Sequence, residues 1–173
     1  MMFDVWMRVL AAVPGSVLWL LHGSDTADAN LRREAAARGV APERLLFAPP
    51  SPLGAHLARH ACADQFLDTF PCNAHTTAND SLFAGLPLLT CAGETFAARV
   101  SGSHLRAVGM TELVTSSLDE YEALAVALAR DPARLVALRE RLTRERATVP
   151  LFDIAAWTRD LESRLLQAWD ALG

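Results

Sequence analysis

The sequence predicts an α/β fold of the Rossmann-like kind, a three-layer unit in which a parallel sheet of about five strands lies between helices. Continuous apolar runs, such as residues 17–21, have the length and composition of strands that are buried on both faces. These runs alternate with helical segments through short loops, which is the order typical of βαβ units. Residues 1–173 are therefore expected to form one domain.

The expected elements follow in chain order. Apolar side chains at helical spacing predict an opening helix from residue 3 that ends at Pro14-Gly15. The expected strands cover residues 17–21, 44–47, 65–68, 88–90 and about 112–114. The further helices are expected at residues 27–38, around residue 56, and from residues 75–77, 94–95, 118, 132 and 154. The last helix carries an apolar stripe that indicates core or interface packing.

Composition excludes several functions. A net charge of −4 provides no basic field, which argues against nucleic-acid binding. All 16 basic residues are arginine, so no lysine is present to clamp phosphate or form a Schiff base. The apolar run at residues 9–21 is interrupted by Pro14-Gly15 and is too short to span a bilayer, so we expect no membrane segment and a cytoplasmic location. The three cysteines have no metal-ligand spacing.

The stretch from residue 65 to residue 80 predicts an anion site. A short strand leads through a turn-rich loop into a helix that opens at His75-Thr76-Thr77. The first turn of a helix has four backbone N–H groups without intrahelical partners, and the helix dipole places about half a positive charge there. A diphosphate can bind such a terminus without a metal. Asp80 lies one turn deeper, where it is placed for ribose hydroxyls. The alternative is that Thr76 or Thr77 only caps a helix and Asp80 is a surface acid.

Histidines at two other places are candidates. His22 follows the first strand at its carboxyl end, where ligands bind in open α/β sheets, although a plain loop histidine is the simpler interpretation. His56 and Arg59 share one face of a short helix after the loop Pro49-Pro50-Ser51-Pro52. From the residues alone, these two are a solvated helix face. The loop lacks backbone donors, which leaves its carbonyls free as acceptors for a planar base.

The His75-Thr76-Thr77 motif with Asp80, preceded by Leu67-Asp68-Thr69 and followed by residues 84–87 and 93–100, resembles the catalytic region of the O-GlcNAc transferases and their bacterial relatives. These are GT-B glycosyltransferases of family 41 with two Rossmann-like lobes. The resemblance extends from about residue 3 to residue 169. It implies the C-terminal, donor-binding lobe, with the N-terminal lobe and the tetratricopeptide repeats outside this chain.

The resemblance also implies roles for residues. His56 and Arg59 match positions that recognise uracil, and His75, Thr76 and Thr77 match those that hold the diphosphate. Thr95 would lie beside the donor, either as a helix cap or as a phosphate contact.

The implied activity is inverting, metal-independent transfer of N-acetylglucosamine from UDP to Ser or Thr of an acceptor protein. No cofactor is expected, and the sequence contains no Asp-x-Asp metal motif. No catalytic base is identifiable, and we expect the isolated fragment to be inactive. The alternatives are a UDP-sugar-binding regulatory module without transferase activity and an unrelated Rossmann-like protein. A dehydrogenase is disfavoured because no G-x-G-x-x-G follows the first strand.

Overall fold

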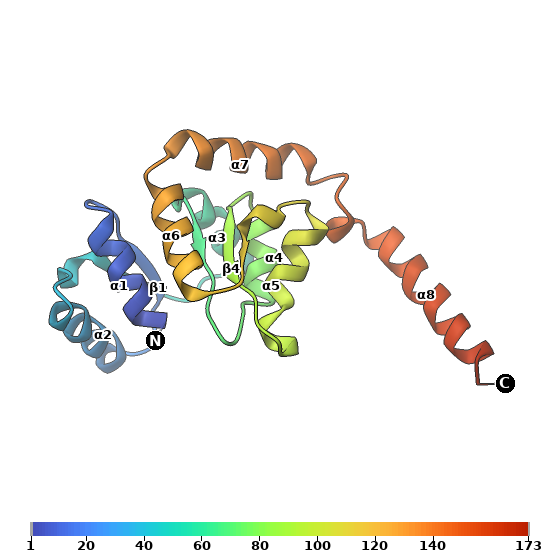
Figure 1. The fold of residues 1–173 in the computed structure, drawn as a ribbon, viewed down its shortest axis with the longest axis horizontal. Helices are drawn as coiled ribbons and strands as arrows, with labels where there is room; N and C mark the ends of the chain where they lie inside the picture. The colour runs from blue at the N-terminus through green and yellow to red at the C-terminus, as the bar shows by residue number, and fades with distance from the viewer. Residues whose placement is uncertain (1, 173) are drawn as a thin grey trace.

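Residues 2–172 are described by a computed structural model, in which helices flank short parallel strands (Figure 1). The helices are α1 (Met2–Ala12), α2 (Asp25–Ala37), α3 (Leu53–Arg59), α4 (Thr76–Phe83), α5 (Val100–Ala107), α6 (Leu118–Ala129), α7 (Pro132–Glu145) and α8 (Ile154–Asp170). The strands are β1 (Leu18–Leu21), β2 (Leu45–Ala48), β3 (Phe66–Leu67), β4 (Leu88–Cys91) and β5 (Val114–Thr115). Short 3-10 turns lie at η1 (Pro42–Arg44), η2 (His60–Cys62), η3 (Phe96–Ala98), η4 (Thr111–Leu113) and η5 (Pro150–Phe152). The predicted α/β class and the predicted order of elements are confirmed.

The five strands form two sheets, where the sequence predicted one. β1 pairs with β2, while β3, β4 and β5 form a second sheet, and every pairing is parallel. Within residues 2–172, no ladder joins β1 to the second sheet. The two sheets are joined instead by side-chain packing beneath α1. Val5 and Val9 of this helix belong to the same cluster as Leu89 of β4, and Met7 belongs to the cluster of Leu18 on β1.

Helix α4 is fixed in place by its buried face. Ala78 and Leu82 are fully buried in the largest core cluster, which also contains Leu88 of β4 and Leu105 of α5. Side chains three and four positions apart share a helix face, so Ala78 and Leu82 bury the same face of α4. The residues at the start of the helix lie outside that buried face and are exposed to solvent. The strand before α4 and the strand after it are adjacent in the sheet, so the loop that enters α4 lies at the carboxyl edge of β3.

The segment after β4 differs from the prediction of a helix starting at residues 94–95. The chain first makes the single 3-10 turn η3, and the α-helix begins only at Val100. Thr95 caps η3 rather than an α-helix, because its side-chain oxygen accepts from the backbone N–H of Ala98 at 3.3 Å.

Helix α8 leaves the body of the molecule and extends away from it (Figure 1). Its predicted apolar stripe is exposed along the described helix, with Trp157 61% and Trp169 75% exposed. None of the helices within residues 2–172 combines the length and the apolar character needed to cross a bilayer.

Candidate nucleotide-binding site

The start of α4 is open to solvent and has no side-chain cap. His75, Thr76 and Thr77 are all exposed, and the His75 side chain, at the capping position, makes no capping hydrogen bond. The first regular hydrogen bond of the helix is donated by Asn79 to the His75 carbonyl at 3.1 Å. The backbone N–H groups of the first turn therefore face outward at the positive end of the helix dipole. This arrangement suits an anion with several oxygens, such as a diphosphate.

The loop that leads into α4 is held from below by the buried carboxylate of Asp68. Asp68 is 1% exposed, and one of its oxygens accepts from the backbone N–H groups of Thr69 at 2.8 Å and Ala74 at 2.7 Å. Its other oxygen accepts from the hydroxyl of Thr90 at 2.6 Å. Burial raises the pKa of the Asp68 carboxyl, and these three donors oppose that rise. Since both ends of the loop are tied to one side chain, the direction of the α4 terminus is fixed.

Further buried groups complete this support. Tyr121 of α6 donates its hydroxyl to the Asp68 carbonyl at 2.9 Å, and burial raises the Tyr121 pKa well above its usual range. Asn73, 4% exposed, donates to the carbonyls of Thr69 and Cys91, and Ser101 donates to the Ala74 carbonyl. No local sequence pattern identifies Asn73, Ser101 or Tyr121 as a support of this loop. The only sequence signal was an acidic residue directly after an apolar strand, at Asp68.

Helices α3 and α4 bring together three of the predicted site residues. The His56 Nε2 atom lies 3.7 Å from the Asp80 Oδ2 atom. Arg59 donates to the His56 Nδ1 atom at 2.8 Å, and because a guanidinium only donates, the proton of neutral His56 is on Nε2, which faces Asp80. Desolvation, together with the charges of His60 and Arg59, lowers the pKa of His56, so a neutral ring is favoured at pH 7.

Two features near the site have structural explanations that the sequence did not give. The Pro49 carbonyl was expected to be a free acceptor, but it accepts from Arg59 at 3.0 Å. A side chain on Gly93 would place its Cβ 2.8 Å from the Ala98 Cβ and 3.1 Å from the Phe70 ring, so glycine is required here by packing within the chain.

Thr95 lies just after Gly93, at the start of the turn η3. The next residue, Phe96, approaches the His75 ring edge-on, with 6.1 Å between the ring centroids.

His22 is paired with a buried acid. Its Nδ1 atom lies 2.7 Å from Asp28 Oδ2, and this hydrogen bond raises the pKa of His22.

An NMR titration of the ring protons is expected to shift the pKa values of two histidines in opposite directions from the ordinary histidine value of about 6.5. The pKa of His22 is expected to lie above that value and the pKa of His56 below it. Because the pKa of His22 is raised on folding, the stabilisation from its pair is complete below pH about 6.5 and is lost as pH rises through the folded value. Asp28→Asn is expected to return the His22 pKa toward its ordinary value and to leave His56 unchanged. Equal pKa values at both rings in the wild type would contradict this assignment.

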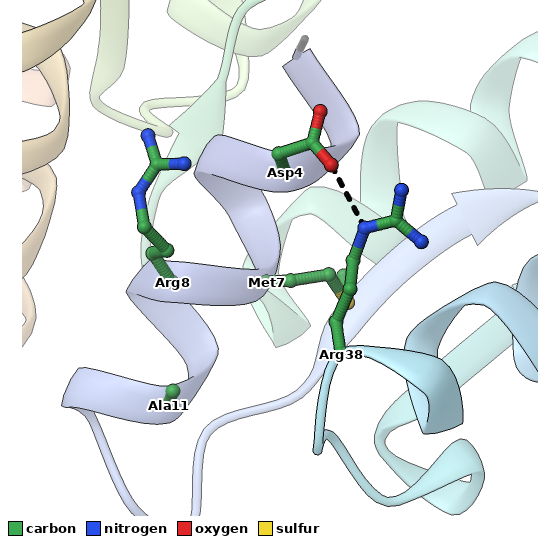
Figure 2. Close-up of a pocket in the computed structure, with 5 residues that line it drawn as sticks. All are labelled: Asp4, Met7, Arg8, Ala11 and Arg38. Atoms are coloured by element: carbon green, nitrogen blue, oxygen red, sulfur yellow. Dashed lines mark hydrogen bonds and ion pairs between the residues drawn. The ribbon is translucent and has the colours of Figure 1, made fainter.

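Residues 2–172 contain no group of three or more acidic, histidine or cysteine side chains placed to hold a metal ion. A hollow elsewhere on the molecule is lined by residues of α1 together with Arg38, which donates to Asp4 at 2.8 Å (Figure 2). It includes no predicted site residue. We place the candidate site at the solvent-facing start of α4, where His75, Thr76 and Thr77 are exposed.

Comparisons with known proteins show which family this chain belongs to. Residues 1–161 match the family model of glycosyl transferase family 41. The chain is 39% identical over 168 residues to a probable UDP-N-acetylglucosamine–peptide N-acetylglucosaminyltransferase, SEC, of Arabidopsis thaliana. It is 37% identical over 166 residues to the UDP-N-acetylglucosamine–peptide N-acetylglucosaminyltransferase of Caenorhabditis elegans. These alignments cover 96% of this chain in both cases, but only 17% and 14% of the two relatives, respectively.

Solved structures show the same relationship. A variant of the Thermobaculum terrenum O-GlcNAc transferase superposes with a TM-score of 0.92 at 34% identity, covering 97% of this chain and 33% of that one. The glycosyltransferase WaaG, involved in lipopolysaccharide biosynthesis, superposes with a TM-score of 0.64 at 16% identity, covering 91% of this chain and 42% of that one, which shows a shared fold alone. The predicted α/β fold class is therefore shared with both structures. Because the family model covers most of its length, this chain belongs to glycosyl transferase family 41.

Proposed function

We propose that this chain is the donor-binding lobe of a protein O-GlcNAc transferase-like enzyme. It holds UDP-GlcNAc, and together with the rest of a longer enzyme it transfers the sugar to a Ser or Thr hydroxyl of an acceptor protein. The observation that carries this proposal is the uncapped, solvent-facing start of α4 with His75, Thr76 and Thr77 beside the His56–Asp80 pair. The names of the relatives supply the sugar nucleotide and the peptide acceptor.

The proposed chemistry depends on charge stabilisation. In an inverting transfer, the bond from the sugar to the diphosphate breaks and UDP leaves with developing negative charge. The N–H groups and hydroxyls at the start of α4 are oriented donors that are already in place, which is the arrangement that lowers the energy of such a transition state without a cation. The Asp68 network keeps these donors from reorienting during the reaction.

The nucleoside is assigned to the α3 side of the site. A neutral His56 ring presents a flat apolar face for a base, while Arg59 holds the ring orientation through Nδ1. Asp80 accepts from ribose hydroxyls and lies far enough along α4 from the phosphates to avoid repelling them. Thr95, whose hydroxyl oxygen already accepts from Ala98, has one hydroxyl proton left to donate to a phosphate.

Thr77→Ala and Asp80→Ala are each expected to weaken UDP binding about fivefold to tenfold, as the loss of one hydrogen bond worth about 1 kcal/mol predicts. Isothermal titration calorimetry of the full 173-residue chain measures this effect. Thr26→Ala and Asp119→Ala are matched controls, because both residues are exposed in the first turns of other helices. Unchanged UDP affinity in both site variants would remove the site assignment.

A regulatory module that binds UDP-sugars without transferring them remains the second candidate. It rests on the same start of α4 and the same His56–Asp80 pair, which would bind a UDP-sugar with or without transfer. The chain spans about a sixth of the length of the curated relatives it matches. The transferase proposal expects no transfer by the isolated chain, and transfer when a polypeptide carrying the N-terminal lobe and the tetratricopeptide repeats is supplied. Retained UDP binding with no transfer in that mixture would favour the regulatory module. The cytoplasmic location is likewise a proposal, to be checked by fractionation.

A further inference from the structure

His22 and Asp28 form a pair to which the proposed function gives no role. The His22 Nδ1 atom lies 2.7 Å from Asp28 Oδ2. Asp28 is 7% exposed, and its second oxygen, Oδ1, is buried without a hydrogen-bond partner. The side chain of His22 is 36% exposed. A buried carboxylate is therefore hydrogen bonded to a histidine that is itself open to solvent.

The small stabilisation that this pair gives at low pH does not by itself account for the arrangement. Exposed ion pairs contribute little, whereas burying a carboxylate with an unpaired oxygen is unfavourable. The start of α2 offsets part of that cost, because Asp28 lies in the first turn of the helix, where the dipole favours negative charge. What the pair does achieve is orientation. The Asp28 carboxylate accepts from Nδ1–H, which fixes the His22 ring and leaves Nε2 as its free polar atom.

His22 lies at the same end of the strands as the candidate nucleoside contacts. Its backbone N–H donates to the Ala48 carbonyl of β2 at 2.8 Å, which extends the β1–β2 pairing by one step. Pro49, the first residue after that strand, accepts from Arg59 through its carbonyl, and Arg59 in turn donates to His56. A continuous set of contacts therefore joins His22 to the group assigned to the base, and carboxyl edges of parallel strands are where ligands bind in open α/β sheets.

We propose that His22 is a further contact for the nucleoside end of the donor, with its Nε2 atom hydrogen bonded to a ribose hydroxyl, and that Asp28 is the positioning residue for its ring. A hydroxyl both donates and accepts, so it pairs with Nε2 whether or not the imidazole carries a second proton. The inference rests on the proposed function, because it assumes that the base lies against His56.

Calorimetric titrations of the 173-residue chain with UDP and with UMP test the assignment. His22→Ala is expected to weaken both nucleotides by the same factor, about fivefold, since both carry the same nucleoside. His22→Gln, which keeps a polar end group, is expected to recover part of this loss. Asp28→Asn is expected to give a smaller loss. Asp119→Asn, an exposed acid in the first turn of α6, is the matched control and is expected to give none. Thr77→Ala is expected to weaken UDP more than UMP, because it acts at the diphosphate.

Two measurements separate binding from folding. Urea unfolding midpoints check that His22→Ala remains folded, and the imidazole ¹⁵N shift of His22 in the wild-type chain is expected to move when UMP is added. Unchanged UMP affinity in His22→Ala, or no shift of the His22 nitrogen in a chain that binds UMP, would overturn the inference and leave the proposed function intact. A loss confined to UDP would place His22 at the diphosphate and overturn the nucleoside assignment. Failure of the wild type to bind either nucleotide would overturn the proposed function together with this inference.

Discussion

Asp68→Ala is expected to lower the free energy of unfolding by about 3–5 kcal/mol. The substitution would leave the N–H groups of Thr69 and Ala74 and the hydroxyl of Thr90 without an acceptor. Each unsatisfied group costs roughly 1–3 kcal/mol. Removing the desolvated carboxylate offsets part of that sum. Urea unfolding followed by circular dichroism measures the loss. UDP binding is expected to weaken as well, because the loop before α4 would no longer be tied at both ends.

Two further variants make this test specific. Asp68→Asn keeps one acceptor oxygen for the two backbone N–H groups, so we expect a loss smaller than that of alanine. Asp64→Ala removes an exposed carboxylate shortly before β3 and is expected to stay within about 0.5 kcal/mol of the wild type. If alanine at position 68 were no more destabilising than alanine at position 64, the network would not be what fixes the loop.

Leu82→Ala is expected to destabilise the chain by about 2–5 kcal/mol, because the leucine is completely buried and its removal leaves a cavity beneath α4. The same substitution at Leu166 on α8, where the side chain is 65% exposed, is expected to change the unfolding free energy by less than about 0.5 kcal/mol. Differential scanning calorimetry of both variants provides the comparison.

The cavity is also expected to affect the proposed site, because Leu82 anchors the helix whose first turn we propose as the anion site. UDP affinity should fall in Leu82→Ala and be largely retained in Leu82→Met, which conserves volume and typically loses less than about 1.5 kcal/mol. Full UDP affinity in a destabilised Leu82→Ala chain would show that the direction of α4 is held by the loop alone.

Features of the fold that depend on local sequence patterns were predicted correctly more often than features that depend on contacts between distant residues. Short apolar runs predicted all five strands. Apolar side chains at helical spacing, together with proline and glycine at the ends of the segments, predicted α1, α2, α6, α7 and α8. The start of α4 was predicted from turn residues followed by His75-Thr76-Thr77. The helix expected from residues 94–95 begins only at Val100, because Thr95 suits a 3-10 turn as well as an α-helix and caps the turn η3.

The class of fold, the order of its elements and the likeness to family 41 can be predicted from the amino-acid sequence, because they depend on local periodicity and on contiguous motifs. The pairing of the strands cannot, because the backbone edges that meet in space come from distant parts of the chain. Three side-chain contacts also depend on the tertiary structure. They are the approach of His56 to Asp80, the hydrogen bonds of the Asp68 carboxylate to its loop, and the pairing of His22 with buried Asp28. Each of these depends on atoms from different elements coming within hydrogen-bond or ion-pair reach, and burial then sets their charge and direction.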